Sequence, residues 1–418
     1  MIEVPATKIQ WSLLHRILFR LFAIYFTFYV FTGIYDLLGW LMEEPVTWAG
    51  KLLIAKDYTI TVRTNGSGDT TYNYLFIFCH AVLSLLLCII WSIADWKRSN
   101  YNRLRYWLML LIRFGLAYSM MFYGFYKILK VQFPDARLWQ MDQPFGMTSP
   151  MGLAWRFMGY SAGFNYFTGF GEFFGGLFLF FRRTKLFGAL LSIVVLSNIV
   201  ALNLCYDIPV KLFSIHLLLM AVFICYPDFI RLIKFFFLNK PVPADNSYHP
   251  HYKRRWMRIL HPIVKYVIVL LLIGYTFYVP YYTQQSINPT ATRPSFYGSY
   301  DVKSRIHSNQ DSIPWKTVYI ERKNMLACMN DSNKFKYYEI TIDSVHRKIT
   351  GENMMGSTDT TRKDKLELSY IADGPKLRLL EGTAGNDTIR LELNKRDLNM
   401  YRLINRGFHW INEFPYNR

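Results

Sequence analysis

Apolar stretches long enough to cross a membrane constrain this chain more than any other feature of its sequence. Seven stretches of roughly 17 to 25 residues lie before Thr283, and each could span ~30 Å of hydrocarbon as a helix. After Thr283 the sequence becomes polar and alternates apolar with polar residues. The predicted fold class is therefore a membrane α-helical bundle of about seven transmembrane helices, followed by a small antiparallel all-β soluble domain.

Four segments follow from these shifts in composition. Residues 1–105 hold two transmembrane helices with an outer loop, and residues 106–238 hold a four-helix membrane core. Residues 239–283 form a basic cytoplasmic loop and the seventh transmembrane helix, and residues 284–418 form a linker and the β domain. The linker is placed at Gln284 to Pro314, and strands are predicted in "WKTVYIE", "FKYYEITID", "KLELSYIA", "KLRLLEG" and "DTIRLELN". The aromatic ending "NRGFHWINEFPYNR" is expected to seal the sheet, with ligand binding as the alternative.

Positive charge indicates a membrane surface rather than a nucleic acid. The net charge is +19, but Lys and Arg cluster at the ends of the apolar stretches, where lipid headgroups and topology account for them. One side collects the groups Lys8 to Arg20, Lys97 to Arg105, Arg182 to Lys185 and Arg231 to Arg258. That side is predicted to be cytoplasmic, which places the amino terminus inside and the β domain outside. If one transmembrane helix were miscounted, the β domain would lie on the cytoplasmic side instead.

Two helices of the core carry ionisable groups at helical spacing. Arg113 and Lys127 share one stripe of the first core helix, and Glu172 lies on a stripe of small and polar residues in the second. The second helix also carries small-xxx-small pairs, which let helices approach closely in lipid. A carboxylate near the bilayer midplane costs free energy unless it has a partner. We therefore expect a buried ion pair between Arg113 and Glu172.

The same residues resemble a known family. "RFGLAYSMMFYGFYKIL" and "YFTGFGEFFGGLFLFFRRTKLFGALLSIVVLSNIVALN" are similar to the DoxX family of four-helix membrane proteins, over roughly Arg105 to Phe236. Gly124, Lys127, Glu172, Gly175 and Gly176 match the family pattern. The resemblance implies that the protein lies in the bacterial cytoplasmic (inner) membrane. It also implies that the protein is a membrane partner of redox or quinone-linked enzymes. Distant relatives include the vitamin-K-dependent carboxylase membrane domain, in which a lysine acts as a base. The flanking helices and the β domain depart from the family's minimal pattern.

Polar residues near the outer end of the core predict a pocket. No Cys or His pairs have metal spacing, and no Walker, GxSxG or post-strand GxGxxG motif is present, so no metal site and no catalytic residue are assigned. Lysines at helix ends more often reach towards headgroups, and a lone histidine more often packs in a core. The pocket candidates are Lys127, Asn198, Asn203, Asp207, Lys211 and His216.

Two functional hypotheses follow. The first is a non-catalytic membrane module that binds a lipid, a quinone, or a membrane or periplasmic partner protein, and displays its β domain outside. The second is a membrane enzyme, quinone-linked or carboxylase-like, that acts on an apolar substrate at the outer leaflet. In that hypothesis Lys127, Asp207 or His216 would serve as acid/base groups. Quinone is the cofactor that both hypotheses allow.

Overall fold

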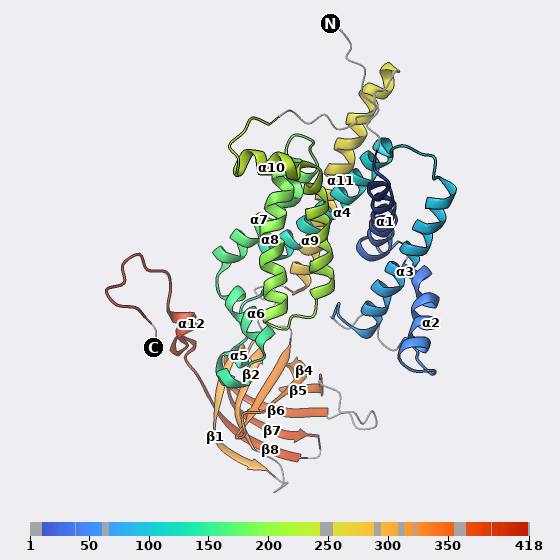
Figure 1. Ribbon diagram of the computed structural model, residues 1–418. Coiled ribbons are helices and arrows are strands. Elements are labelled where there is room, and N and C mark those ends of the chain that lie inside the picture. Colours follow the sequence, from blue (N-terminus) through green and yellow to red (C-terminus); the bar gives the residue numbers. More distant parts are fainter. Residues whose placement is uncertain are drawn as a thin grey trace. The chain divides into compact units, whose positions relative to one another are not determined.

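Two compact units make up the computed structural model (Figure 1). It describes residues 11–37, 39–60, 67–242, 254–287, 294–307, 314–321, 324–354, 365–385 and 387–416. The helical unit comprises Met1–Gln132 and Gly163–Tyr282, and the barrel unit comprises Phe133–Ala162 and Thr283–Arg418. Residues 133–162, which lie inside the predicted membrane core, thus belong with the β domain, and no pattern in the sequence indicated this.

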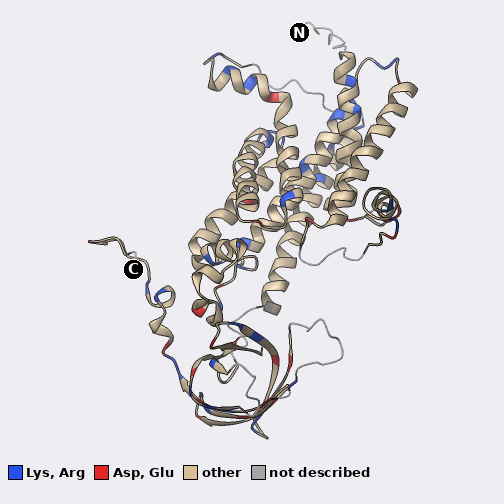
Figure 2. Ribbon diagram, turned by 60° about the horizontal axis from the view of Figure 1, so that its bottom comes forward, with Lys and Arg blue, Asp and Glu red and all other residues tan. Residues whose placement is uncertain are grey.

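Helices in the first unit confirm the predicted helical region. Six segments are long and apolar enough to cross a membrane: Leu13–Ile34, Thr71–Ala94, Asn102–Ile128, Lys185–Cys205, Lys211–Phe236 and Arg255–Ser286. The elements are α1 (Leu13–Tyr29), η1 (Val30–Ile34), η2 (Gly39–Met42), α2 (Glu43–Leu53), α3 (Thr71–Ala94), α4 (Asn102–Ile128), α7 (Ala162–Leu179), α8 (Lys185–Cys205), α9 (Lys211–Cys225), η4 (Tyr226–Asp228), α10 (Phe229–Phe236) and α11 (Arg255–Ile287). Figure 2 shows that the long helices carry few Lys, Arg, Asp or Glu residues.

Contacts between helix ends show that α7 runs the length of this bundle. Asp69, just before α3, accepts hydrogen bonds from the backbone N–H groups of Lys211 and Leu212 at the start of α9. At the opposite end, Lys185 at the start of α8 lies 3.9 Å from Asp228, just after α9. The chain leaves α4 at the Asp69 end and enters α8 at the Asp228 end. It therefore returns through α7, antiparallel to α4.

Two local features differ from the predicted helices. The segment expected to form the outer loop between the first two transmembrane helices contains α2, Glu43–Leu53, whose Trp48 and Leu52 side chains are exposed. The predicted second core helix is interrupted at Ser161, which caps α6 (Pro150–Tyr160) before α7 begins. Both departures involve short helices that a search for membrane-length stretches does not detect.

An eight-stranded closed antiparallel barrel forms the second unit, confirming the predicted antiparallel β domain. Each strand pairs with the next along the chain, and β8 pairs with β1 to close the barrel. The predicted linker is wrong in part, because it contains β1. The strands are β1 (Gly298–His307), β2 (Trp315–Glu321), β3 (Met325–Asn330), β4 (Phe335–Asp343), β5 (Lys348–Asn353), β6 (Lys365–Asp373), β7 (Lys376–Ala384) and β8 (Asp387–Lys395).

Burial along the strands shows how α5 (Leu138–Asp142) belongs to the barrel. In β6 and β8 buried residues alternate with exposed or partly exposed ones, as expected for an inner face and a wet outer face. In β2 and β3 nearly every residue is buried. Leu138 and Trp139 cover the outer face of these strands, packing with residues that include Tyr319 and Met325. Further short elements are η3 (Phe145–Met147), η5 (Leu398–Met400) and α12 (Arg402–Asn405).

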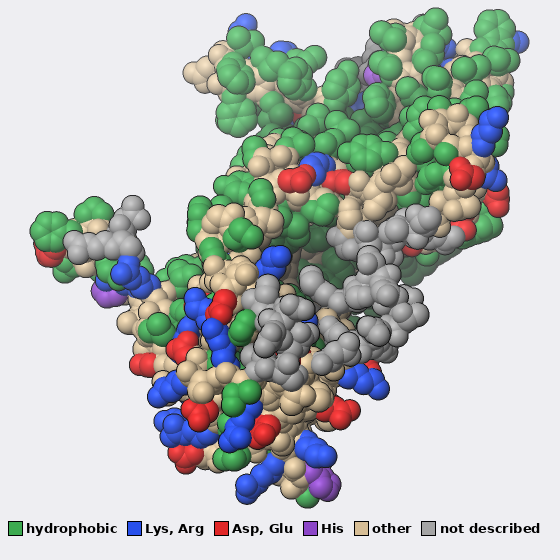
Figure 3. Space-filling model, turned by 90° about the horizontal axis from the view of Figure 1, so that it is seen from below, with side chains coloured by type: hydrophobic (Ala, Val, Ile, Leu, Met, Phe, Trp, Pro, Cys, Tyr) green, Lys and Arg blue, Asp and Glu red, His purple; other side chains and the backbone are tan. Residues whose placement is uncertain are grey.

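The aromatic ending does not seal the sheet. Phe408, Trp410 and Phe414 are all more than three-quarters exposed, so this expectation is wrong. The barrel interior is filled instead by side chains of the strands themselves, including Tyr300 and Tyr338. The predicted alternative, a ligand contact for this segment, is not tested by the structure. In Figure 3 the barrel surface carries mixed charges, whereas hydrophobic side chains dominate the helical unit.

Candidate functional site

A buried ion pair joins α4 to α7. The Lys127 Nζ donates hydrogen bonds to both Glu172 carboxylate oxygens, at 2.7 and 2.8 Å. Both side chains are more than nine-tenths buried. Such a pair compensates the cost of removing each charge from water, provided that both members are present. The carboxylate therefore has the partner within the bundle that its position requires.

Glycines set the register that makes this pair. An added Cβ at Gly124 would lie 2.8 Å from the Gly169 carbonyl oxygen, and one at Gly176 would lie 2.8 Å from the Ala117 carbonyl oxygen. These distances are shorter than real Cβ atoms show, so the backbones of α4 and α7 touch at both levels. In this antiparallel register Glu172, three residues after Gly169, lies level with Met121, three residues before Gly124.

The expected pair between Arg113 and Glu172 is therefore wrong. Side chains tilt towards the amino terminus of their own helix. In antiparallel helices Glu172 and Lys127 tilt towards each other, whereas Arg113, eight residues before the level of Glu172, tilts away from it. The Arg113 guanidinium instead donates two hydrogen bonds, of 2.8 and 2.6 Å, to the carbonyl oxygen of Leu179 at the end of α7.

His216 forms a second buried polar contact, between α9 and α1. Its Nε2 lies 2.6 Å from the Tyr25 hydroxyl, and its Nδ1 lies 2.6 Å from the Leu212 carbonyl oxygen. Because a carbonyl only accepts, Nδ1 donates and Nε2 accepts from Tyr25. The imidazole also stacks on Tyr29, with ring centroids 4.4 Å apart. His216 thus has hydrogen-bond partners at both ring nitrogens and packs between two helices. Of the two interpretations, a core histidine and an acid/base group, this arrangement favours the core histidine.

His80 on α3 extends this polar contact. Its Nε2 lies 2.9 Å from the Thr32 hydroxyl, and its Nδ1 lies 3.2 Å from the Phe76 carbonyl oxygen. Its ring centroid is 6.3 Å from that of Tyr25, the residue bonded to His216. Three helices therefore share one buried group of histidines, tyrosines and a threonine. Only His216 of this group was a candidate from the sequence, because its partners lie on helices outside the predicted core.

Hydrogen bonds or ion pairs engage most of the remaining pocket candidates. Asn203 donates a 2.9 Å hydrogen bond to Ser214, which tethers α8 to α9. Lys211 binds the exposed Asp207 at 2.8 Å and lies 3.7 Å from Asp69. The Lys211 hydrogen bond lowers the pKa of Asp207. Asn198 is exposed on α8. Each polar candidate apart from Asn198 thus has its own partner.

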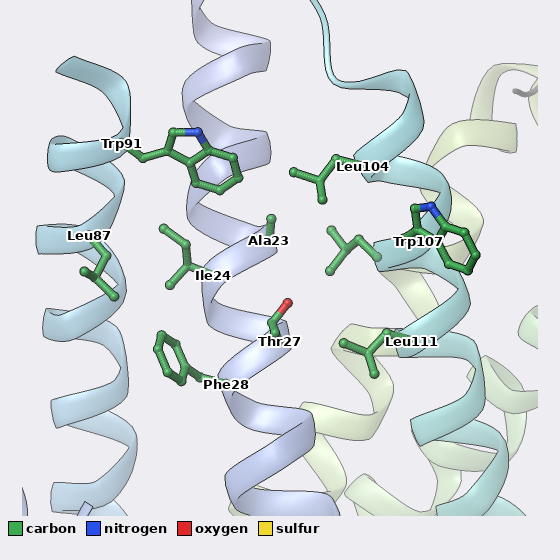
Figure 4. Close-up of a pocket in the computed structure, with 10 residues that line it drawn as sticks. Ala23, Ile24, Thr27, Phe28, Leu87, Trp91, Leu104, Trp107 and Leu111 are labelled. Atoms are coloured by element: carbon green, nitrogen blue, oxygen red, sulfur yellow. The ribbon is translucent and has the colours of Figure 1, made fainter. Parts of the chain in front are cut away.

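An apolar groove lies between α1, α3 and α4 (Figure 4). Its volume is about 380 Å³, within the ~300 to 1,000 Å³ of small-molecule sites. Figure 4 shows side chains of all three helices facing one space, with Trp91 and Leu104 towards one end. The sequence did not single out this groove, since no polar motif marks it. Its lining residues are Ala23, Ile24, Thr27, Phe28, Leu87, Trp91, Leu104, Trp107, Leu108 and Leu111.

The described part of the chain was compared with the ligand sets that metal ions need. No group of three or more His, Cys, Asp or Glu side chains there could hold a metal ion. All five cysteines are free thiols. The groove is lined by carbon apart from Thr27 and the indole N–H groups, so it suits an apolar chain better than a charged or metal-bound cofactor.

Comparison with known proteins gives one relationship. Over 116 residues the chain is 32% identical to the uncharacterized protein YwoB of Bacillus subtilis, which is 28% of this chain and 73% of that protein. No family model matches the sequence. No solved structure matches it either.

Proposed function

Since the chain belongs to the family of the uncharacterized Bacillus subtilis protein YwoB, whose name states no activity, we propose a function from the residues of this chain. In this proposal the protein is a DoxX-like integral membrane protein, and its helical unit binds a lipid-like molecule in the groove between α1, α3 and α4. The observation that carries this proposal is the groove, which is open and apolar, whereas the candidate acid/base groups hold partners.

The enzyme hypothesis has weaker support. Lys127 is bound to Glu172, His216 to Tyr25, and Asp207 to Lys211. An acid/base catalyst must reach the proton that it transfers, and these three groups are engaged on different sets of helices. Lys127 and His216 join neighbouring helices, which a structural role explains, and Asp207 pairs with Lys211 at an exposed position. We therefore favour the binding module over quinone reduction or carboxylation.

The proposed topology places the barrel outside the cytoplasmic membrane of a bacterium. In this proposal the six membrane-length helices and α7 make seven crossings, and the cation-rich ends of α1, α4 and α8 support a cytoplasmic location for that side. A reporter that works only in the cytoplasm should be active when fused after Asn239 and silent when fused after Arg418. Activity at Arg418 would contradict the seven-crossing arrangement.

Ligand binding is tested on the purified full chain. After extraction in mild detergent, mass spectrometry should find an apolar molecule retained at about one per protein chain. Thr27→Phe fills the groove from α1 and should abolish retention. The matched control is Val194→Phe, at an exposed position of α8 away from the groove lining, and it should retain the molecule. Equal retention by the two variants would overturn the proposal.

A further inference from the structure

Cations lie in line with the groove at its Trp91 end on the two helices that flank it. On α4, Arg103 lies one turn before Trp107 and two turns before Leu111, so the three share one stripe. On α1, Arg16 and Arg20 lie at spacings of four before Ile24, which lines the groove. The stripes that form the apolar walls thus continue into arginines.

Hydrogen bonds fix part of this cationic end. Arg20 is buried and donates to the Tyr101 hydroxyl and the Asp95 carbonyl oxygen, both at 2.8 Å. Arg16 donates to the Arg98 carbonyl oxygen at 2.7 Å, so α1 is tied to the loop between α3 and α4. These bonds go mostly to neutral acceptors, which leave the positive charges in place. The same region therefore keeps an excess of positive charge.

Carboxylates do not balance these cations. Asp95 lies 3.6 Å from Arg98, and it also accepts a hydrogen bond from Tyr101. Arg103 on α4 is exposed, and so is Lys97 in the loop. The described residues from 95 to 105 thus contain one acid against Lys97, Arg98, Arg103 and Arg105. A negatively charged group would complement this end of the groove.

We propose that the groove binds an anionic phospholipid, with one acyl chain along the apolar walls and the phosphate at Arg103 and its neighbouring cations. The inference rests on the proposed function and names the class of ligand. An acyl chain matches the carbon lining, and the phosphate matches the cations that lie one to two helical turns beyond it. A free phosphate would leave the apolar walls empty, so a lipid satisfies both parts. The cation-rich side faces the cytoplasmic leaflet in the proposed topology, where anionic lipids are available.

The experiment measures lipid selectivity of the full chain. Delipidated protein is incubated in detergent with equal amounts of phosphatidylglycerol and phosphatidylcholine of the same acyl length, and the bound lipid is quantified by native mass spectrometry. The wild type should retain phosphatidylglycerol in several-fold excess. Arg103→Gln should reduce that excess about fivefold, since one cation near a lipid surface contributes that factor. Arg103→Lys should restore most of it.

A matched control removes the same charge elsewhere. Arg183 is exposed in the turn between α7 and α8, at the same end of the bundle but on helices that do not line the groove. Arg183→Gln should leave the selectivity unchanged. Equal retention of both lipids by the wild type would overturn the anionic assignment while the groove still binds lipid. Retention of neither lipid would overturn both the assignment and the proposed function.

Discussion

The two units hold their buried charges in different surroundings. In the helical unit Lys127 and Glu172 form a pair between two helices, each more than nine-tenths buried. In the barrel unit Arg396 is partly exposed and binds Asp142 of α5, Asp301 of β1 and the Tyr401 hydroxyl together. Burial acts to lower the pKa of Arg396, but its hydrogen bonds to Asp301 and Tyr401 and the charge of Asp142 raise it overall. The comparison teaches that the two sites differ in their access to water: the helical pair is buried, whereas the groups of the barrel cluster are partly exposed.

Breaking the helical pair should have the largest effect. Glu172→Ala leaves the Lys127 ammonium buried without its carboxylate, and should cost roughly 3 to 5 kcal/mol of unfolding free energy. Replacing both residues with methionine should be much milder, because no charge is then buried. Thermal unfolding of the full chain in detergent would measure both. Arg113→Met combined with Glu172→Met should instead give additive losses, since those residues do not contact each other.

The helical pair also shows where inference from sequence fails. Helical spacing put Arg113 and Lys127 on one stripe and Glu172 on a face for contact with protein, and Glu172 does have a partner in the bundle. Choosing between the two cations required the register of α4 against α7, which the Gly124 and Gly169 backbone contact fixes. A single sequence does not show which glycine of α4 contacts which glycine of α7. It therefore predicts burial of Glu172 but not the identity of its partner.

Strands were easier to place than helix partners. β2 and β4 were predicted with the bounds that the structure has, because each alternates apolar with polar residues between turn formers. Apolar β3 and short β5 lack that signal and were missed. Closure of the barrel and the docking of α5 depend on contacts between residues more than 80 positions apart, such as Asp301 with Arg396. Local patterns carry no information about such contacts.

Removing the barrel cluster should have a smaller effect than breaking the helical pair. Arg396→Ala should cost about 1.5 to 3 kcal/mol, the range for a hydrogen bond to a charged group, because water can reach the groups left behind. Hydrogen exchange should accelerate at α5 and β1 in particular. Arg390→Ala is the control, since Arg390 is exposed and only 4.0 Å from Glu381. Unchanged exchange at α5 in the Arg396 variant would show that the cluster does not anchor it.

The glycine contact should respond to a single methyl group. Gly124→Ala forces the α4 and α7 backbones apart, and should cost about 1 to 3 kcal/mol, as overpacking does. Gly274→Ala on α11 is the matched control, because an added Cβ there meets nothing within 4 Å. It should be neutral or slightly stabilising, since alanine favours helices. Thermal unfolding in detergent would compare the two. Equal stability of both variants would contradict the close approach of α4 and α7.

The test with the smallest expected effect compares the reactivity of one thiol in each unit. Cys328 lies inside the barrel, where burial raises its pKa to about 12, so about one thiol in ten thousand is ionised at pH 8. Cys205, at the end of α8, is exposed. A maleimide at pH 8 should therefore label Cys205 of the folded chain in detergent and reach Cys328 only after denaturation. Comparison with Cys328→Ala by mass spectrometry identifies the adduct at Cys328 among those that denaturation adds at the buried cysteines. Labelling of Cys328 as fast as Cys205 would mean that the barrel opens readily, because the thiolate forms only when the interior meets water.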